Sequence, residues 1–172
     1  MNNDSGFTPK ELRKLRSMKN PYGIQKFLDD MPYHLEDTAW SPRKVLAEES
    51  SHCLEGAIFG AAALRANGYP PLLLDFEAEH DTDHVIAVFQ EAGCWGAVAK
   101  SNYTGCRWRE PIYRNLRELA LSYFNAYFNF FLITIVSFSL ATNSHGGCLF
   151  LHSACQLIPI FYSALVHFSI FH

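Results

Sequence analysis

Apolar residues recur at helical spacing in the first third of the chain, and each run begins with a capping signal. Three runs open with a hydroxyl or amide side chain followed by proline, at Thr8-Pro9, Asn20-Pro21 and Ser41-Pro42. The side-chain oxygen can cap the first turn, and proline suits the first helical position. A fourth run opens at Ser51-His52-Cys53 and ends before Gly68, a good residue for terminating a helix. The pattern predicts four helices.

Beyond Gly68 the apolar residues alternate with polar ones. Three segments are typical of strands: Pro71–Ala78, His84–Gln90 and Cys94–Lys100. A polar loop follows at Ser101–Arg109, and a further helix is predicted from about Pro111 to Phe124. The sequence therefore predicts an α+β domain in which helix 53–67 packs on a small antiparallel sheet of three strands.

Charged residues stop abruptly at Glu118. All 14 lysines and arginines and all 17 acidic residues lie at or before it, and residues 119–172 contain none. If about a quarter of positions are charged in an ordinary domain, chance gives such a run roughly once in several million. We therefore divide the chain into a domain at 1–128 and an uncharged apolar tail at 129–172.

The tail has three interpretations. It contains two apolar runs near the ~20 residues that a bilayer span needs, but neither has flanking lysine or arginine. A membrane hairpin is one reading, and a non-native sequence, such as translation out of the original frame, is another. The third is an apolar element that packs in a larger assembly. Membrane association is expected only through residues 129–172.

Net charge and cysteine usage narrow the class further. A formal charge of −3 gives no reason to expect nucleic acid as a partner. The polar N-terminus at 1–6 lacks the basic-then-apolar pattern of a secretory signal. Five cysteines form an odd set without framework spacing, which favours reduced thiols and a cytoplasmic location.

One cysteine stands where nucleophilic chemistry is favoured. Cys53 opens the fourth helix, where the helix dipole stabilises a thiolate. His84 begins a strand and is a candidate base for that thiol, and Asn102 follows the next strand as a candidate for orienting the histidine. Nearby, Glu55 is expected to interact with the helix dipole, and His52 could line a cleft.

This order of residues resembles the core of the transglutaminase-like superfamily, relatives of the papain-type cysteine peptidases. The resemblance spans residues 40–105 and rests on four pieces: Cys53 with Ala57 four residues on, Ala63–Pro70, His84–Phe89, and Trp95 through Asn102. It implies a cysteine-bearing helix packed on an antiparallel sheet, with acyl transfer on a protein or peptide substrate and no cofactor.

The chain departs from the family pattern at two positions. The family usually has an aspartate a few residues after the tryptophan, whereas this chain has Ser101 and Asn102. An aromatic residue two after the histidine is common in the family, and here Ile86 takes that place. Since asparagine also orients the histidine in papain-like enzymes, the first departure weakens the enzyme interpretation without ending it.

Two function classes follow from these residues. The first is a cysteine-dependent acyl transferase that hydrolyses amide or peptide bonds; we favour water over an amine as acceptor because the short core leaves little room for an amine site. The alternative is a catalytically inactive binding or scaffold module of the same fold, which the missing aspartate supports.

A zinc site is a weaker interpretation. Acidic and histidine residues cluster at 79–84, and Cys53, Cys94 and Cys106 might converge on them. The chain has no Cys-x-x-Cys pair, however, and the two histidines of the cluster fall across a loop and a strand. We therefore expect no metal.

Overall fold

The structure is a computed structural model that describes residues 6–76, 83–126, 137–141, 150–155 and 166–171. Its helices are α1 (Pro9–Arg16), α2 (Pro21–Asp30), α3 (Pro42–Glu48), α4 (Cys53–Ala66), the short 3₁₀ helix η1 (Thr104–Cys106) and α5 (Leu116–Leu121). Its strands are β1 (Leu72–Phe76), β2 (His84–Glu91), β3 (Cys94–Val98), β4 (Arg109–Tyr113), β5 (Ser137–Ala141), β6 (Phe150–Cys155) and β7 (Val166–Phe171). The described part is therefore α+β, as the sequence predicts.

The first three helices begin at the predicted caps. The side-chain oxygens of Thr8, Asn20 and Ser41 each accept a hydrogen bond from the backbone N–H three residues on. Glu11 returns a second bond by accepting from the Thr8 N–H at 2.6 Å. These bonds satisfy backbone donors that a helix start would otherwise leave unpaired.

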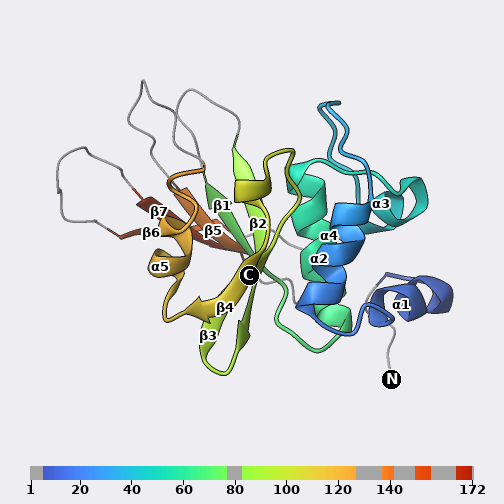
Figure 1. Cartoon of the computed structure of the whole chain (residues 1–172), viewed down its shortest axis with the longest axis horizontal. Helices are drawn as coiled ribbons and strands as arrows, with labels where there is room; N and C mark the ends of the chain where they lie inside the picture. Colours follow the sequence, from blue (N-terminus) through green and yellow to red (C-terminus); the bar gives the residue numbers. More distant parts are fainter. Residues whose placement is uncertain (1–5, 77–82, 127–136, 142–149, 156–165, 172) are drawn as a thin grey trace.

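Helices α1 to α4 lie together on one side of a four-stranded sheet, and α5 lies on the other (Figure 1). The strand order is β1-β2-β3-β4, and all pairs are antiparallel. Along β2 the side chains alternate between the two faces: Ala87 and Phe89 pack with the helices, whereas Ile86 and Val88 pack with α5. The sheet is thus covered on both faces.

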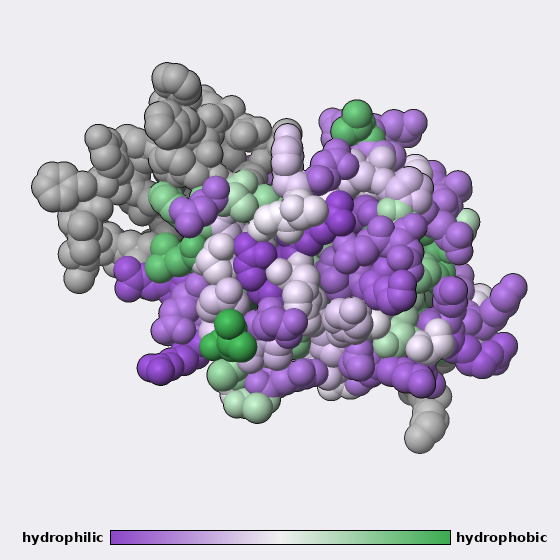
Figure 2. Space-filling model, in the orientation of Figure 1, coloured by the Kyte–Doolittle hydropathy of each residue, from purple (hydrophilic) through white to green (hydrophobic). Residues whose placement is uncertain are grey.

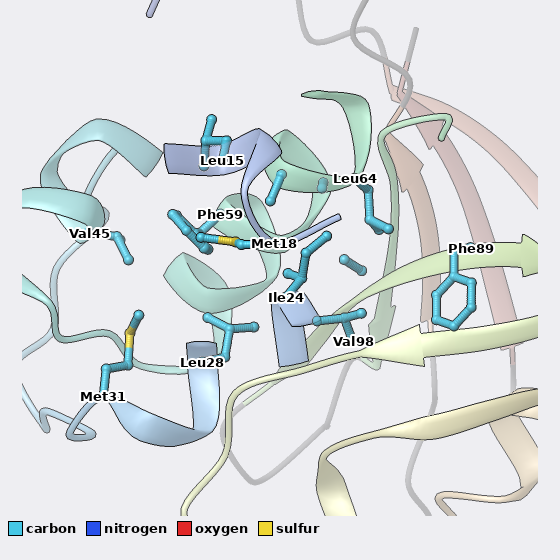
Figure 3. Packing of buried hydrophobic residues seen from close by; sticks show 13 residues of the cluster. Leu15, Met18, Ile24, Leu28, Met31, Val45, Phe59, Leu64, Phe89 and Val98 are labelled. Atoms are coloured by element: carbon cyan, nitrogen blue, oxygen red, sulfur yellow. The ribbon is translucent and has the colours of Figure 1, made fainter. Parts of the chain in front are cut away.

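The larger core cluster joins the four N-terminal helices to this sheet. Figure 3 shows Phe59 of α4 among Leu15, Met18 and Ile24, with Val98 of β3 beyond them. Leu15, Ile24 and Phe59 are fully buried, and burial of each such side chain contributes on the order of 2 kcal/mol. This packing sets where the first turn of α4 meets the sheet.

The sequence prediction was wrong at residues 109–124. A fourth strand, β4, occupies Arg109–Tyr113, and the helix that follows is only Leu116–Leu121. Pro111 therefore lies in a strand, which is compatible with an edge position because β4 pairs only with β3 in its sheet. The register between β3 and β4 shifts between Trp95 and Ala97, where the chain approaches closely at Gly96.

The described parts of the apolar tail form a second sheet of order β5-β7-β6. Strand β5 lies beside β1 of the first sheet (Figure 1). Within the described residues, no helix is long and apolar enough to cross a bilayer. Much of both apolar runs lies outside the described residues, so the three interpretations of the tail stay predictions.

Candidate active site

Cys53 is the first residue of α4, and its half-buried thiol contacts the beginning of β2. The sulfur lies 3.6 Å from the carbonyl oxygen of Asp83, to which the thiol donates. Asp83 directly precedes His84 in the sequence, so the thiol contacts the backbone next to the predicted base.

The first residues of β2 are not paired with β3, which leaves them accessible to the Cys53 thiol. Pairing of β2 with β1 extends to His84, opposite Phe76, whereas pairing with β3 ends at Ala87 opposite Val98. The first residues of β2 therefore project beyond β3. The N-terminus of α4 meets β2 along this projecting stretch, which is why two segments about thirty residues apart come together.

His84 is a buried residue that holds the following polar loop. Its side chain shares the α5 face of the sheet, stacks on Phe76 at 6.0 Å, and the residue is 4% exposed. Its Nε2 lies 2.7 Å from the carbonyl oxygen of Cys106. Because a carbonyl can only accept, Nε2 carries the hydrogen and the basic lone pair is on Nδ1. That tautomer suits a base that accepts a thiol proton through Nδ1.

The polar loop is tied down from several sides. Tyr123 Oη donates to the carbonyl of Arg107 at 2.6 Å, and Arg109 Nη2 donates to the carbonyl of Gly105 at 2.7 Å. Together with the His84 bond to Cys106, these contacts pair consecutive carbonyls of the loop. His84 therefore has a structural role whether or not it is also a base.

Electrostatics keep both groups of the predicted pair neutral at rest. Burial raises the pKa of the Cys53 thiol, against the hydrogen bonds from Val85, Leu54 and Tyr33. Burial lowers the pKa of His84 to about 4, and the Arg109 charge acts in the same direction. Both shifts disfavour proton transfer from the Cys53 thiol to His84 in the resting site.

The structure places the three predicted site residues differently. Cys53 contacts the backbone of Asp83, the residue before His84, whereas the His84 side chain packs with Phe76 and Tyr123 on the α5 face, and no hydrogen bond among the described residues joins the two side chains. Asn102 is exposed, and the bond that orients His84 Nε2 comes from the Cys106 backbone. The expectation for Asn102 therefore finds no supporting contact. Its neighbour Ser101 is buried and accepts a bond from the Tyr103 N–H at 3.1 Å.

Glu55 is the centre of a buried hydrogen-bond cluster that the sequence only hinted at. Its carboxylate accepts from His34 Nε2 at 2.7 Å, Thr38 Oγ1 at 2.6 Å, and the backbone N–H groups of Trp40 and His52 at 2.8 and 3.3 Å. Burial opposes the charge, but these donors together hold the pKa of Glu55 below its usual value. The cluster fixes the first turn of α4 to the segment 34–40.

His52 belongs to this cluster and not to a cleft wall. Its Nε2 lies 2.6 Å from the carbonyl oxygen of Thr38 and 3.5 Å from the Glu55 carboxylate. Its ring meets that of His34 edge-on at 5.2 Å. The Glu55 carboxylate and the His52 ring nitrogen are thus paired, whereas the buried Nδ1 of His34 has no hydrogen-bond partner among the described residues.

Tyr33 is a half-buried residue outside the segment 40–105 that carries the family resemblance. Burial raises the pKa of its phenol, and the charge of Cys53 acts in the same direction.

The residues considered for the weaker zinc interpretation fall partly outside the described chain. Glu79, His80 and Asp81 lie in the segment 77–82, of which nothing is described. Among the residues that the structure does describe, no three histidine, cysteine or acidic side chains come together as a metal site.

Comparison with known proteins does not assign the chain to a family. No family model matches the chain, and no curated protein matches it.

Proposed function

We propose that the described domain is a transglutaminase-like acyl-transfer domain in which Cys53 is the nucleophile and His84 the base. The observation that supports it most is the position of the Cys53 sulfur at the start of β2, 3.6 Å from the carbonyl oxygen of Asp83, the residue before His84. The Nε2–H tautomer of His84, held by the Cys106 carbonyl, supports the role of Nδ1 as the proton acceptor.

The reaction is balanced through these groups. The thiol turns from the Asp83 carbonyl toward His84 and gives its proton to Nδ1, and the sulfur attacks the carbonyl carbon of an amide. The oxygen becomes an oxyanion that accepts a hydrogen bond from the Cys53 backbone N–H. The imidazolium then protonates the leaving amine, and a thioester remains on Cys53. Water resolves the thioester to a carboxylic acid and restores the thiol.

The substrate class is a protein or peptide amide, with hydrolysis favoured over transfer to an amine. Such a thiol needs a reducing compartment, and we place the protein in the cytoplasm on that ground. The proposed mechanism starts from a neutral thiol and a neutral imidazole, so it needs no thiolate at rest. The hydrogen bond between a nucleophile and its base is often long or poorly aligned before substrate binds.

A second candidate is a non-catalytic binding or scaffold module of the same fold. The observation that favours it is the electrostatic state of the site: burial raises the pKa of Cys53 and lowers that of His84. His84 would then serve only to fix the loop at Cys106.

Turnover assays on the full chain separate the two candidates. We expect hydrolysis of p-nitrophenyl acetate and of fluorogenic peptide amides, with hydroxylamine added in parallel to detect amine transfer. Cys53→Ala should abolish turnover, and His84→Gln should lower it by ~10²-fold or more. Cys94→Ala, which removes another half-exposed thiol, should have no effect. Turnover that is equal in the starting protein and in Cys53→Ala would favour the scaffold candidate.

A further inference from the structure

The carbonyl oxygen that binds His84 belongs to η1, a single 3₁₀ turn with few bonds of its own. Within the turn, the Cys106 N–H donates to the Tyr103 carbonyl at 3.0 Å and the Arg107 N–H donates to the Thr104 carbonyl at 3.3 Å. A 3₁₀ turn has poorer hydrogen-bond geometry than an α-helix. The direction of the Cys106 carbonyl therefore depends on contacts from outside the turn.

Arg109 joins η1 to the end of α5. Its Nη2 donates to the carbonyl oxygens of Gly105 at 2.7 Å and Ser122 at 3.0 Å, and its Nε donates to the Ser122 hydroxyl at 2.9 Å. Gly105 directly precedes Cys106, so the guanidinium holds the peptide unit next to the carbonyl that His84 binds. Because the donors of a guanidinium form a rigid fork, they set the direction of these contacts as well as their distance.

The same guanidinium stacks over Tyr123, whose ring lies next to that of His84. The Cζ atom of Arg109 is 3.8 Å from the centroid of the Tyr123 ring, and the centroid of the His84 ring is 6.2 Å from it. The Tyr123 hydroxyl donates to the Arg107 carbonyl at 2.6 Å, one residue after Cys106. Arg109 therefore acts on the turn from both sides of Cys106, directly and through Tyr123.

The charge of Arg109 acts together with this geometry. Among the described residues, no carboxylate forms an ion pair with it. Burial lowers the pKa of His84 to about 4, and the Arg109 charge acts in the same direction. A neutral imidazole carries one ring hydrogen, and the Cys106 carbonyl decides which nitrogen holds it.

We propose that Arg109 is a positioning residue for His84, which holds the Cys106 carbonyl on Nε2 and thereby keeps the basic lone pair on Nδ1. The catalytic meaning of this role rests on the proposed acyl transfer, in which Nδ1 accepts the thiol proton. The contacts themselves do not depend on that reaction. Lysine at this position would keep the charge and lose the fork, so the two contributions can be separated.

The test is ¹⁵N NMR of the full chain in detergent micelles, with ¹⁵N in the histidine rings and no substrate present. The His84 signals are those lost in His84→Gln, and at neutral pH they should show a protonated Nε2 and an unprotonated Nδ1. In Arg109→Lys we expect the share of the Nδ1–H form to rise by about fivefold, the effect of one lost hydrogen bond. Arg117→Lys is the matched control, because it makes the same change at an exposed arginine of α5. It should leave the tautomer ratio unchanged.

An unchanged tautomer ratio in folded Arg109→Lys would overturn the proposal, even if that variant were less stable in urea. A starting protein with the hydrogen on Nδ1 would also overturn it. If circular dichroism shows that Arg109→Lys does not fold, Ser122→Ala replaces it, since it removes the hydroxyl that accepts from Nε. A smaller rise in the same direction is then expected, and no rise would again overturn the role.

The outcome is separate from that of the turnover assays because no substrate is present. Turnover together with an unshifted tautomer ratio would contradict the positioning role alone. A shifted ratio without any turnover would support the positioning of His84 and contradict the acyl transfer.

Discussion

At the scale of single residues, the site combines a thiol and an imidazole that are both disfavoured as ions. Cys53 is half-buried beside β2, and His84 is almost fully buried against Phe76 and the Cys106 carbonyl. The sulfur nevertheless lies at the N-terminus of α4, which favours the thiolate as it forms. Reactivity therefore depends on groups that act during proton transfer more than on a preformed ion pair.

The buried state of His84 makes a prediction for stability. Its pKa is lowered by burial from 6.5 to about 4, so below pH 6.5 the unfolded chain binds a proton that the folded chain does not. Stability is therefore lost as pH falls from 6.5 to about 4, by roughly 3 kcal/mol in total from this residue. In His84→Gln, urea unfolding at several pH values should show a flatter dependence in that window.

Glu55 provides the control, because the pH range in which it affects stability lies below that of His84. Its pKa is held below 4.5, so its contribution is present above that value and is lost as pH falls through the folded-state pKa. Glu55→Gln should change the slope below pH 4.5 and leave the slope between 6.5 and 4.5 in place. An unaltered slope in His84→Gln over that upper window would show that the imidazole is not kept neutral by burial.

At the scale of elements, the site depends on how closely the first turn of α4 meets the chain after β3. A Cβ added at Gly56 would lie 2.3 Å from the Cβ of Lys100, far inside van der Waals contact. Lys100 cannot move aside easily because its Nζ is bound to the end of α2. The absence of a side chain at residue 56 therefore allows α2, α4 and β3 to meet beside Cys53.

Gly56→Ala should lower the free energy of unfolding by about 1–3 kcal/mol, the usual effect of overpacking, despite the better helix propensity of alanine. Gly60→Ala is the matched control, since it makes the same change one turn later. Its Cβ would meet that of Ala87 at 3.2 Å, and the propensity gain offsets this contact. We expect stability within about 1 kcal/mol of the starting protein in urea titrations. Equal effects at the two glycines would contradict the account.

Elements marked by local chemistry could be predicted from the sequence. The caps at Thr8, Asn20 and Ser41 depend on neighbouring residues alone, and all three are present. Strand β4 could not be predicted, because Pro111 fits a helix start locally and only the edge position in the sheet makes it acceptable in a strand. Pairing with β3 therefore determines the structure of this segment, against its local preference for a helix.

The candidate site also has a part that could be predicted from the sequence and a part that could not. Cys53 at a helix start follows from the capping pattern and the apolar run. The Cys106 carbonyl was not predictable as a partner of His84, because tertiary packing brings it there from a segment with no signature. A backbone carbonyl, in particular, leaves no trace in the residue types.

At the scale of the whole molecule, two hydrophobic clusters are described within the N-terminal domain. Both clusters of buried side chains are built from residues up to Tyr123. One face of the molecule is largely hydrophilic, with hydrophobic residues as separate spots (Figure 2). The uncharged tail from residue 129 therefore has a different composition from the domain that it follows.

Removing the tail tests this division. We expect a chain of residues 1–128 to keep the cooperative thermal transition of the full chain and to be monodisperse in buffer without detergent. The full chain should aggregate, because its uncharged apolar segments favour association. Light scattering and calorimetry on the two chains give the comparison. A monodisperse full chain, or loss of the transition on truncation, would contradict the division.

The measurement that tests the central claim most directly is the acylation of individual cysteines by a rapid, activated ester, quantified peptide by peptide in the full chain. Cys94, also half-exposed, serves as the internal reference. The account predicts a thioester on Cys53 that forms at least tenfold faster than on Cys94, turns over with water, and is lost to the level of Cys94 in His84→Gln. Equal rates at Cys53 and Cys94, unchanged by His84→Gln, would make Cys53 a structural residue.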